Sequence, residues 1–173
     1  MNRIFLISIF CLIGALLTGC SLTNSAPKTP LTFSLPSTPI FQRVVSVPYL
    51  VTASSSTADS TPANVIDGDI ESIWNAGAGP EQWIQIDTGS PRSLRAIRLA
   101  VSQYPEGETV HQIWVGADAV SMFQVHEFAG STRDSDVLEF IADGPLENIR
   151  FIKIVTTQSS SWVAWREIEI LAP

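Results

Sequence analysis

Hydrophobic and polar residues alternate in short runs along the chain from about residue 44 onward, a pattern that predicts β-strands. Ile84 and Ile86, for example, fall on one face of such a strand, and Gln85 falls on the other. Clusters of Gly, Pro, Ser and Asp separate the runs, as they do between the strands of β-sandwiches. The runs cover residues 44–53, 82–88, 94–102, 111–117, 121–129, 136–142, 148–157 and 163–171. No segment has a convincing helical period, so we expect an all-β fold of two sheets around one core.

The first twenty residues have a different pattern, which is typical of an export signal. A short segment with Arg3 precedes an apolar run that is too short to span a bilayer comfortably. The sequence Leu17-Thr18-Gly19-Cys20 then resembles the lipobox of bacterial lipoproteins. The resemblance implies that residues 1–19 are a cleaved signal peptide and that Cys20 is lipidated; an ordinary secretory signal with an incidental Cys20 is the alternative. We therefore expect an extracytoplasmic protein, anchored by lipid at Cys20 in a bacterial cell envelope.

Residues 20–44 are rich in Ser, Thr and Pro and show no sustained period. Prolines at positions 27, 30, 36 and 39 exclude a regular helix or a central strand. We interpret this segment as a tether, which leaves residues 45–173 as the single globular domain.

The amino-acid composition excludes several classes of protein. The chain has 10 Lys and Arg against 17 Asp and Glu, a formal net charge of −7, which argues against a protein that binds duplex nucleic acid. Hydrophobic residues make up 45% and charged residues 16%, so the chain is not wholly disordered. Its two cysteines, Cys11 and Cys20, both lie in the export segment, so the domain has no disulfide.

Four blocks of sequence resemble the discoidin family, whose members are also called coagulation factor five/eight type C domains and include family 32 carbohydrate-binding modules. The blocks are Pro62–Trp74, Gln82–Pro91, Arg150–Ile154 and Ser161–Ile170, and they occur in the family's order. The resemblance implies an eight-stranded antiparallel jelly-roll β-sandwich of the galactose-binding-like type. It also implies a recognition module without catalytic activity.

The segment from Asn64 to Ser72 packs acidic and hydroxyl side chains around Gly68. Such oxygens suit a hard cation such as Ca²⁺. The resemblance implies a structural calcium ion that ties this loop to the last strand. The implied ligands are the carboxylates of Asp67 and Glu167, the hydroxyl of Ser72, and oxygens around Asn64 and Asp69. A plain polar turn without a metal is the alternative.

Family members bind glycans, lipid headgroups or proteins through loops at one end of the sandwich. Sugar binding uses an aromatic ring against the C–H face of the sugar and polar side chains for its hydroxyls. The candidate ligand-binding residues are Trp162, Tyr104, Asn75, Glu106 and His111. We expect the tryptophans at positions 74, 83, 114 and 165 to be packing residues. The loop from Ser102 to Val110 lacks the Arg and Asn of galactose-binding relatives, which disfavours galactose itself.

These patterns lead to one main hypothesis and two alternatives. The main hypothesis is a non-catalytic cell-surface lipoprotein that binds carbohydrate and acts as a monomer. A domain for protein interaction or envelope assembly, with a cell-surface protein as partner, is the first alternative. A glycan hydrolase is the remote one, because His111 and His126 lie in no nucleophile or zinc motif and the chain has no G-x-S-x-G elbow.

Overall fold

The computed structural model of the protein describes residues 48–173. The expected signal peptide, Cys20, the tether and the start of the expected strand 44–53 lie outside these residues. Among the residues that are described, no helix has the length and apolar character needed to cross a membrane.

The described domain contains seven β-strands and one 3₁₀ helix, and every strand pairing is antiparallel. In chain order the elements are β1 (Leu50–Ala53), η1 (Pro62–Ile66), β2 (Trp74–Asn75), β3 (Gln82–Val101), β4 (Gly107–Gly116), β5 (Phe123–Thr132), β6 (Val137–Gln158) and β7 (Ala164–Leu171).

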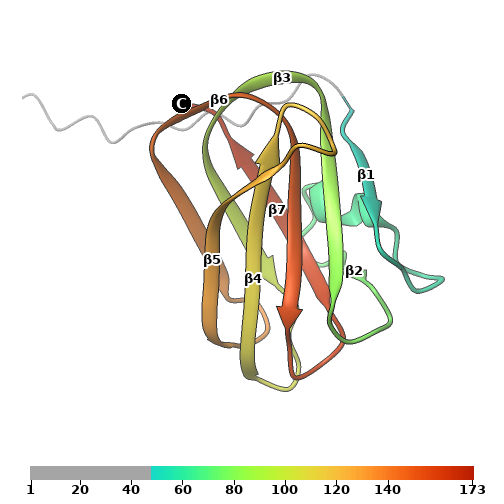
Figure 1. Ribbon diagram of the computed structural model, residues 1–173. Coiled ribbons are helices and arrows are strands. Elements are labelled where there is room, and N and C mark those ends of the chain that lie inside the picture. Colours follow the sequence, from blue (N-terminus) through green and yellow to red (C-terminus); the bar gives the residue numbers. More distant parts are fainter. Residues whose placement is uncertain (1–47) are drawn as a thin grey trace, which may run out of the picture. The chain divides into compact units, whose positions relative to one another are not determined.

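Two long strands, β3 and β6, bend and take part in both layers of the sandwich. Residues 82–87 of β3 pair with residues 151–156 of β6, and residues 96–101 pair with β7. Shifts of register between Asp87 and Ala96 mark the bend in β3. The layer that faces the viewer in Figure 1, which we call sheet one, consists of β1, the first half of β3, the second half of β6, β4 and β5. Sheet two consists of β2, β7, the second half of β3 and the first half of β6.

The expected all-β sandwich is confirmed, and its strand count differs for a physical reason. The eight predicted runs correspond to eight paired segments, but 82–88 and 94–102 form one continuous strand, as do 136–142 and 148–157. The turn-forming residues between those runs sit at the bends rather than in loops. The short strand β2 was not predicted, because two residues are too few to show a period.

The core lies between the two sheets and is built from the alternating inward residues. Ile84, Ile97 and Ile113 are fully buried, and so are the large rings of Trp74 and Trp165. The alternation in sequence therefore places the apolar side chains on the inner faces, as expected for a sandwich.

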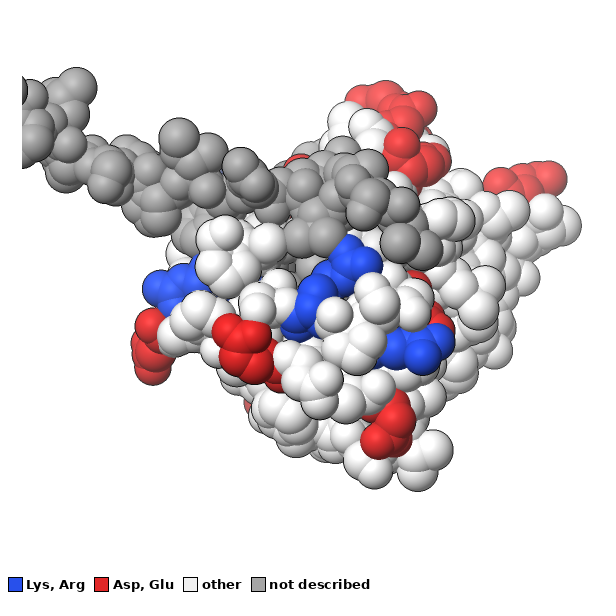
Figure 2. Space-filling view, turned by 90° about the horizontal axis from the view of Figure 1, so that it is seen from above, with Lys and Arg blue, Asp and Glu red and all other residues white. Residues whose placement is uncertain are grey.

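The two ends of the sandwich carry different parts of the chain. The chain enters β1 and leaves after β7 at the end where β3 and β6 bend, whereas the connections β3–β4 and β6–β7 lie at the opposite end (Figure 1). Basic and acidic side chains are mixed on the bend end, which Figure 2 views directly. There Arg150 donates two hydrogen bonds of 2.8 Å to Asp87 and holds the pKa of that carboxyl below its ordinary value.

Candidate functional site

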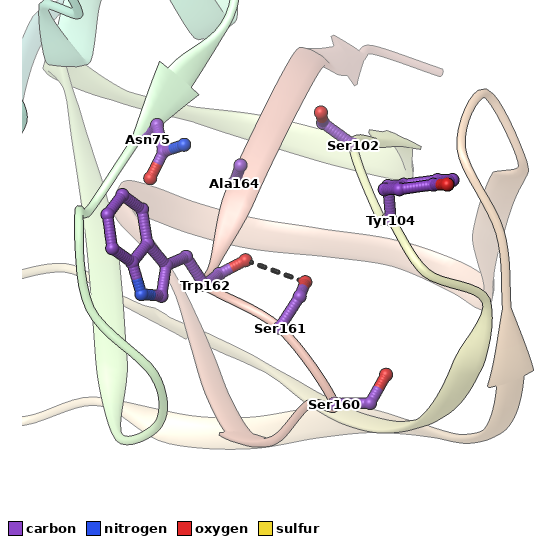
Figure 3. A pocket seen from close by; sticks show the side chains of 7 residues that line it. All are labelled: Asn75, Ser102, Tyr104, Ser160, Ser161, Trp162 and Ala164. Atoms are coloured by element: carbon purple, nitrogen blue, oxygen red, sulfur yellow. Dashed lines mark hydrogen bonds between the residues drawn. The ribbon is translucent and has the colours of Figure 1, made fainter.

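The loops at the end opposite the bends surround an open hollow of about 490 Å³, which we call the end pocket. Two connections supply most of its lining: the β3–β4 connection and the β6–β7 connection. Its lining residues are Asn75, Ser102, Tyr104, Ser160, Ser161, Trp162 and Ala164 (Figure 3). Three of the five predicted ligand-binding residues thus come together from segments far apart in the sequence.

Two aromatic rings stand on opposite sides of the end pocket (Figure 3). Trp162 is 57% exposed and Tyr104 is 88% exposed, although large apolar side chains elsewhere in the domain are mostly buried. Exposed rings offer flat apolar faces to a ligand at little cost in conformational entropy. The pocket therefore has two places at which a sugar ring can stack.

Apart from Ala164 the remaining lining is polar, and none of it carries a charged side chain. The Oδ1 atom of Asn75 accepts a hydrogen bond from the backbone N–H of Gly77 (2.8 Å), and its amide nitrogen points toward the hollow (Figure 3). The hydroxyl of Ser161 has two acceptors at 3.1 Å, the backbone oxygen of Trp162 and the Oε1 atom of Gln103, and its single hydrogen is shared between them. Amide and hydroxyl groups without charge match the hydroxyls of a neutral sugar.

A buried glutamine, Gln103, holds the two pocket loops together. Its Nε2 donates to Ser160 Oγ at 2.9 Å and to the backbone oxygen of Pro105 at 3.0 Å. Its Oε1 accepts hydrogen bonds from the hydroxyls of Ser159 and Ser161 at 3.0 and 3.1 Å. The sequence analysis did not identify Gln103. The only indication in the sequence was its position next to Tyr104, because its partner Ser160 lies over fifty residues further along the chain.

Gly107, at the start of β4, allows the same two loops to approach each other. A Cβ atom at this position would overlap the Ser160 side chain. Any larger residue would therefore push the serine loop away from Gln103.

The structure places the other two predicted ligand-binding residues elsewhere. Glu106 is exposed and accepts a hydrogen bond from Ser131 on β5 at 3.3 Å. His111 is 4% exposed, its Nδ1 lies 3.0 Å from Thr156 Oγ1, and its ring packs edge-on against Trp165. Burial lowers the pKa of His111 to about 4, so the imidazole is neutral at pH 7. A side chain held in the core in this way does not reach the end pocket.

The other four tryptophans fall into two groups. Trp74 and Trp165 are buried packing residues, as predicted, and Trp74 Nε1 donates to the backbone oxygen of Ser55 at 3.1 Å. Trp83 and Trp114 alternate with fully buried neighbours, so their side chains are half-buried on the outer face of sheet one. The prediction of packing residues therefore holds in the core for Trp74 and Trp165, whereas strand alternation turns Trp83 and Trp114 outward.

The predicted calcium loop contacts the last strand, as the prediction requires. The buried carboxylate of Glu167 accepts a hydrogen bond from the backbone N–H of Gly68 at 3.2 Å. Within the loop, three oxygens lie around the Ser72 hydroxyl: Asp67 Oδ2 at 2.8 Å, the Asp69 carbonyl at 3.0 Å and the Asn64 carbonyl at 3.2 Å. All five predicted ligands therefore belong to one structural unit.

The donor set of this loop fits a hard cation. The Ser72 hydroxyl has one hydrogen, which can bond only one of the three oxygens around it. The other two oxygens lie close to the hydroxyl without receiving a hydrogen bond from it. The set consists mainly of carbonyl and hydroxyl oxygens, and residues 48–173 contain no cluster of three His, Cys, Asp or Glu that could hold a metal. Oxygen ligands from the backbone and few carboxylates are compatible with Ca²⁺ and unsuited to softer transition metals.

Comparison with known proteins gives one family and a consistent fold. Residues 51–168 match the sequence model of the F5/8 type C domain. A comparison with curated proteins gave no match.

The solved structures that are most similar include several carbohydrate-binding modules. The family 32 module of NanJ from Clostridium perfringens, in complex with galactose, is 18% identical with a TM-score of 0.63, covering 72% of this chain and 93% of that one. The family 32 module of AlyQ, in complex with 4,5-unsaturated mannuronic acid, is 26% identical with a TM-score of 0.59, covering 70% and 92%. A pectin-binding module is 24% identical with a TM-score of 0.60, covering 75% and 91%.

Proposed function

The chain belongs to the F5/8 type C domain family, and we propose that it binds a carbohydrate at the end pocket without chemical turnover. The observation that carries this proposal is the pairing of exposed Trp162 and Tyr104 across a hollow with polar walls. Solved carbohydrate-binding modules of similar fold support the choice of ligand class. Binding would place a sugar ring against an indole face and its hydroxyls against Asn75 and the serines.

The charge of the lining favours a neutral sugar. A carboxylate or sulfate moved from water into the end pocket would lose hydration, and the lining offers no Lys or Arg to compensate. A neutral hydroxyl loses less and finds amide and hydroxyl partners. The proposed ligand is therefore a neutral glycan of a cell surface or an extracellular polysaccharide.

We also propose that Ca²⁺ binds in the loop between η1 and β2. Asp67, Ser72 and Glu167 would supply side-chain oxygens, and Asn64 and Asp69 would supply backbone oxygens, because Asn64 Oδ1 already accepts a hydrogen bond from the Thr61 hydroxyl at 2.8 Å. The ion would clamp this loop to β7, which ends beside the chain's exit from the domain. Its contribution would be structural, with no role in chemistry.

A glycan array tests the proposed function. We expect the full-length protein in detergent to bind one or more neutral glycans, and the Trp162→Ala variant to lose at least about tenfold in affinity. Phe123→Ala is a matched control, since Phe123 is a similarly exposed ring (53%) on β5, away from the end pocket. If the parent protein bound none of the neutral glycans on the array, the proposal would be contradicted.

The protein-interaction alternative predicts a different outcome. Capture of a cell-surface protein that survives Trp162→Ala and competing sugars would favour it. Hydrolysis of any glycan on the array would instead favour the hydrolase alternative.

A further inference from the structure

The outer face of sheet one carries a cluster of half-buried aromatic and polar side chains that the end pocket does not use. Trp83 and Gln85 come from β3, Trp114 comes from β4, and Phe151 and Lys153 come from β6. Each alternates with buried inward residues such as Ile84, Ile113 and Ile152, so all five point away from the core. We call these five residues the sheet platform; sheet one faces the viewer in Figure 1.

Lys153 lies at the centre of the sheet platform. Its Nζ is 4.6 Å from the centre of the Trp83 ring, a cation–π distance that holds the ammonium near the sheet. In register it pairs with Gln85 on one side and with Trp114 on the other. Residues directly opposite one another have Cβ atoms about 5 Å apart, so an amide, an ammonium and an indole form a row about 10 Å across.

The indole in this row is held in place by a chain of hydrogen bonds. Trp114 Nε1 donates to Gln112 Oε1 at 3.1 Å, and Gln112 Nε2 donates to Glu127 Oε2 at 3.0 Å. The chain fixes the orientation of the Trp114 ring, and it engages one oxygen of the Glu127 carboxylate, which keeps its negative charge. A ligand would meet a ring that is already positioned, which lowers the entropy lost on binding.

The charge of Lys153 is available to a ligand. Arg98, Arg133, Arg150 and Arg166 each form an ion pair with a carboxylate. Within residues 48–173, Lys153 makes no ion pair and the Gln85 side chain makes no hydrogen bond. The nearest acid along β3, Asp87, is neutralised by Arg150, whose guanidinium also lies 5.1 Å from the Phe151 ring centre.

We propose that the sheet platform is a second glycan-binding surface, specific for acidic oligosaccharides such as chains of uronic acids. A uronate carboxylate would pair with the Lys153 ammonium, the neighbouring sugar ring would stack on Trp114, and hydroxyls would bond Gln85. The three-strand width of the row requires more than one sugar ring. The two surfaces therefore differ in chemistry: the end pocket takes a neutral sugar, and the sheet platform takes a charged chain.

An oligogalacturonate titration of the full-length protein in detergent tests this proposal. The indole N–H signals of the tryptophans in an NMR spectrum report which ring is contacted, and calorimetry gives the affinity. We expect the Trp83 and Trp114 signals to move while the Trp162 signal does not, and we expect added salt to weaken binding. Lys153→Gln should weaken binding about tenfold, because a charged hydrogen bond is lost. Lys153→Arg should retain it.

Several results would overturn the proposal. The first is no binding of oligogalacturonate by the parent protein, or equal binding by Lys153→Gln. The second is a loss of oligogalacturonate binding in Trp162→Ala, which would assign the acidic glycan to the end pocket. Binding of polyglutamate as tight as that of oligogalacturonate would also contradict the proposal, because the sheet platform would then recognise negative charge without recognising a sugar. Since Trp162→Ala affects only the end pocket, failure here is distinguishable from failure of the proposed function.

Discussion

Trp162 and His111 show how burial decides what a side chain can do. Both were candidates for ligand contact, yet Trp162 is 57% exposed at a loop junction and His111 is 4% exposed beside Trp165. The serine-rich, strand-free sequence before Trp162 signalled its exposure. His111 begins the predicted strand run 111–117 and shares its face with Ile113 and Val115, and the pairing of β4 with β6 places it in the core beside Thr156.

The buried His111 predicts a loss of stability at acidic pH. Its folded-state pKa of about 4 lies below the unfolded value of about 6.5, so the unfolded chain takes up the proton first. Stability is complete above pH 6.5 and falls between pH 6.5 and 4, by roughly 3 kcal/mol from this group. The carboxyls of Asp87 and Asp134, whose pKa values are lowered by Arg150 and Arg166, add losses only at lower pH.

Urea unfolding at pH 8, 6 and 4.5 measures this effect. The His111→Gln variant keeps a hydrogen-bonding side chain near Thr156 and has no proton to take up. Its free energy of unfolding should fall less than that of the parent between pH 8 and 4.5. Equal falls in both proteins would show that His111 does not cause the pH dependence.

At the scale of elements, the sequence predicted strands better than the contacts between loops. Alternation located every paired segment except the short β2, but Gly89, Ser90 and Pro91 looked like a break although β3 runs through them. The pairing of β3 with β6 across the bend supplies hydrogen bonds that local turn propensity does not reveal. Gln103 was missed for the same reason, because its partners Ser159 to Ser161 meet it only after folding.

Gln103 should therefore be required for both stability and binding. Gln103→Leu removes one hydrogen-bond partner from each of three serine hydroxyls, so we expect a loss on the order of 1–3 kcal/mol in unfolding free energy. We also expect weaker binding of neutral glycans, since both loops line the end pocket. Gln124→Leu, at an exposed position of β5, is the control and should change little. Normal glycan affinity in Gln103→Leu would show that the loops hold their positions without it.

The loop between η1 and β2 should respond to calcium. Thermal unfolding in millimolar Ca²⁺ should occur at least about 5 °C higher than in chelator, because the ion binds only the folded state. Asp67→Ala should remove this difference, and Asp59→Ala, an exposed acid outside the loop, should retain it. A melting temperature that chelator leaves unchanged would contradict the proposed calcium site.

At the scale of the whole domain, the two connections that line the end pocket, β3–β4 and β6–β7, lie at the end opposite the start of β1 (Figure 1). We propose that Cys20 carries a lipid, which would attach the chain to a membrane through the segment that precedes the domain. We predict that Cys20→Ser abolishes incorporation of labelled fatty acid and releases the protein from the membrane fraction. Continued lipid labelling of Cys20→Ser would show that Cys20 is not the acylated residue.

The central claim is that the protein recognises a neutral glycan through Trp162 at the end pocket. The most direct test is an NMR titration of the indole N–H signals with the neutral glycans that bind on the array, using Trp162→Phe to assign the Trp162 signal. The account predicts that the Trp162 signal moves saturably while the signals of buried Trp74 and Trp165 move little. If every bound neutral glycan left the Trp162 signal in place, the claim would be contradicted.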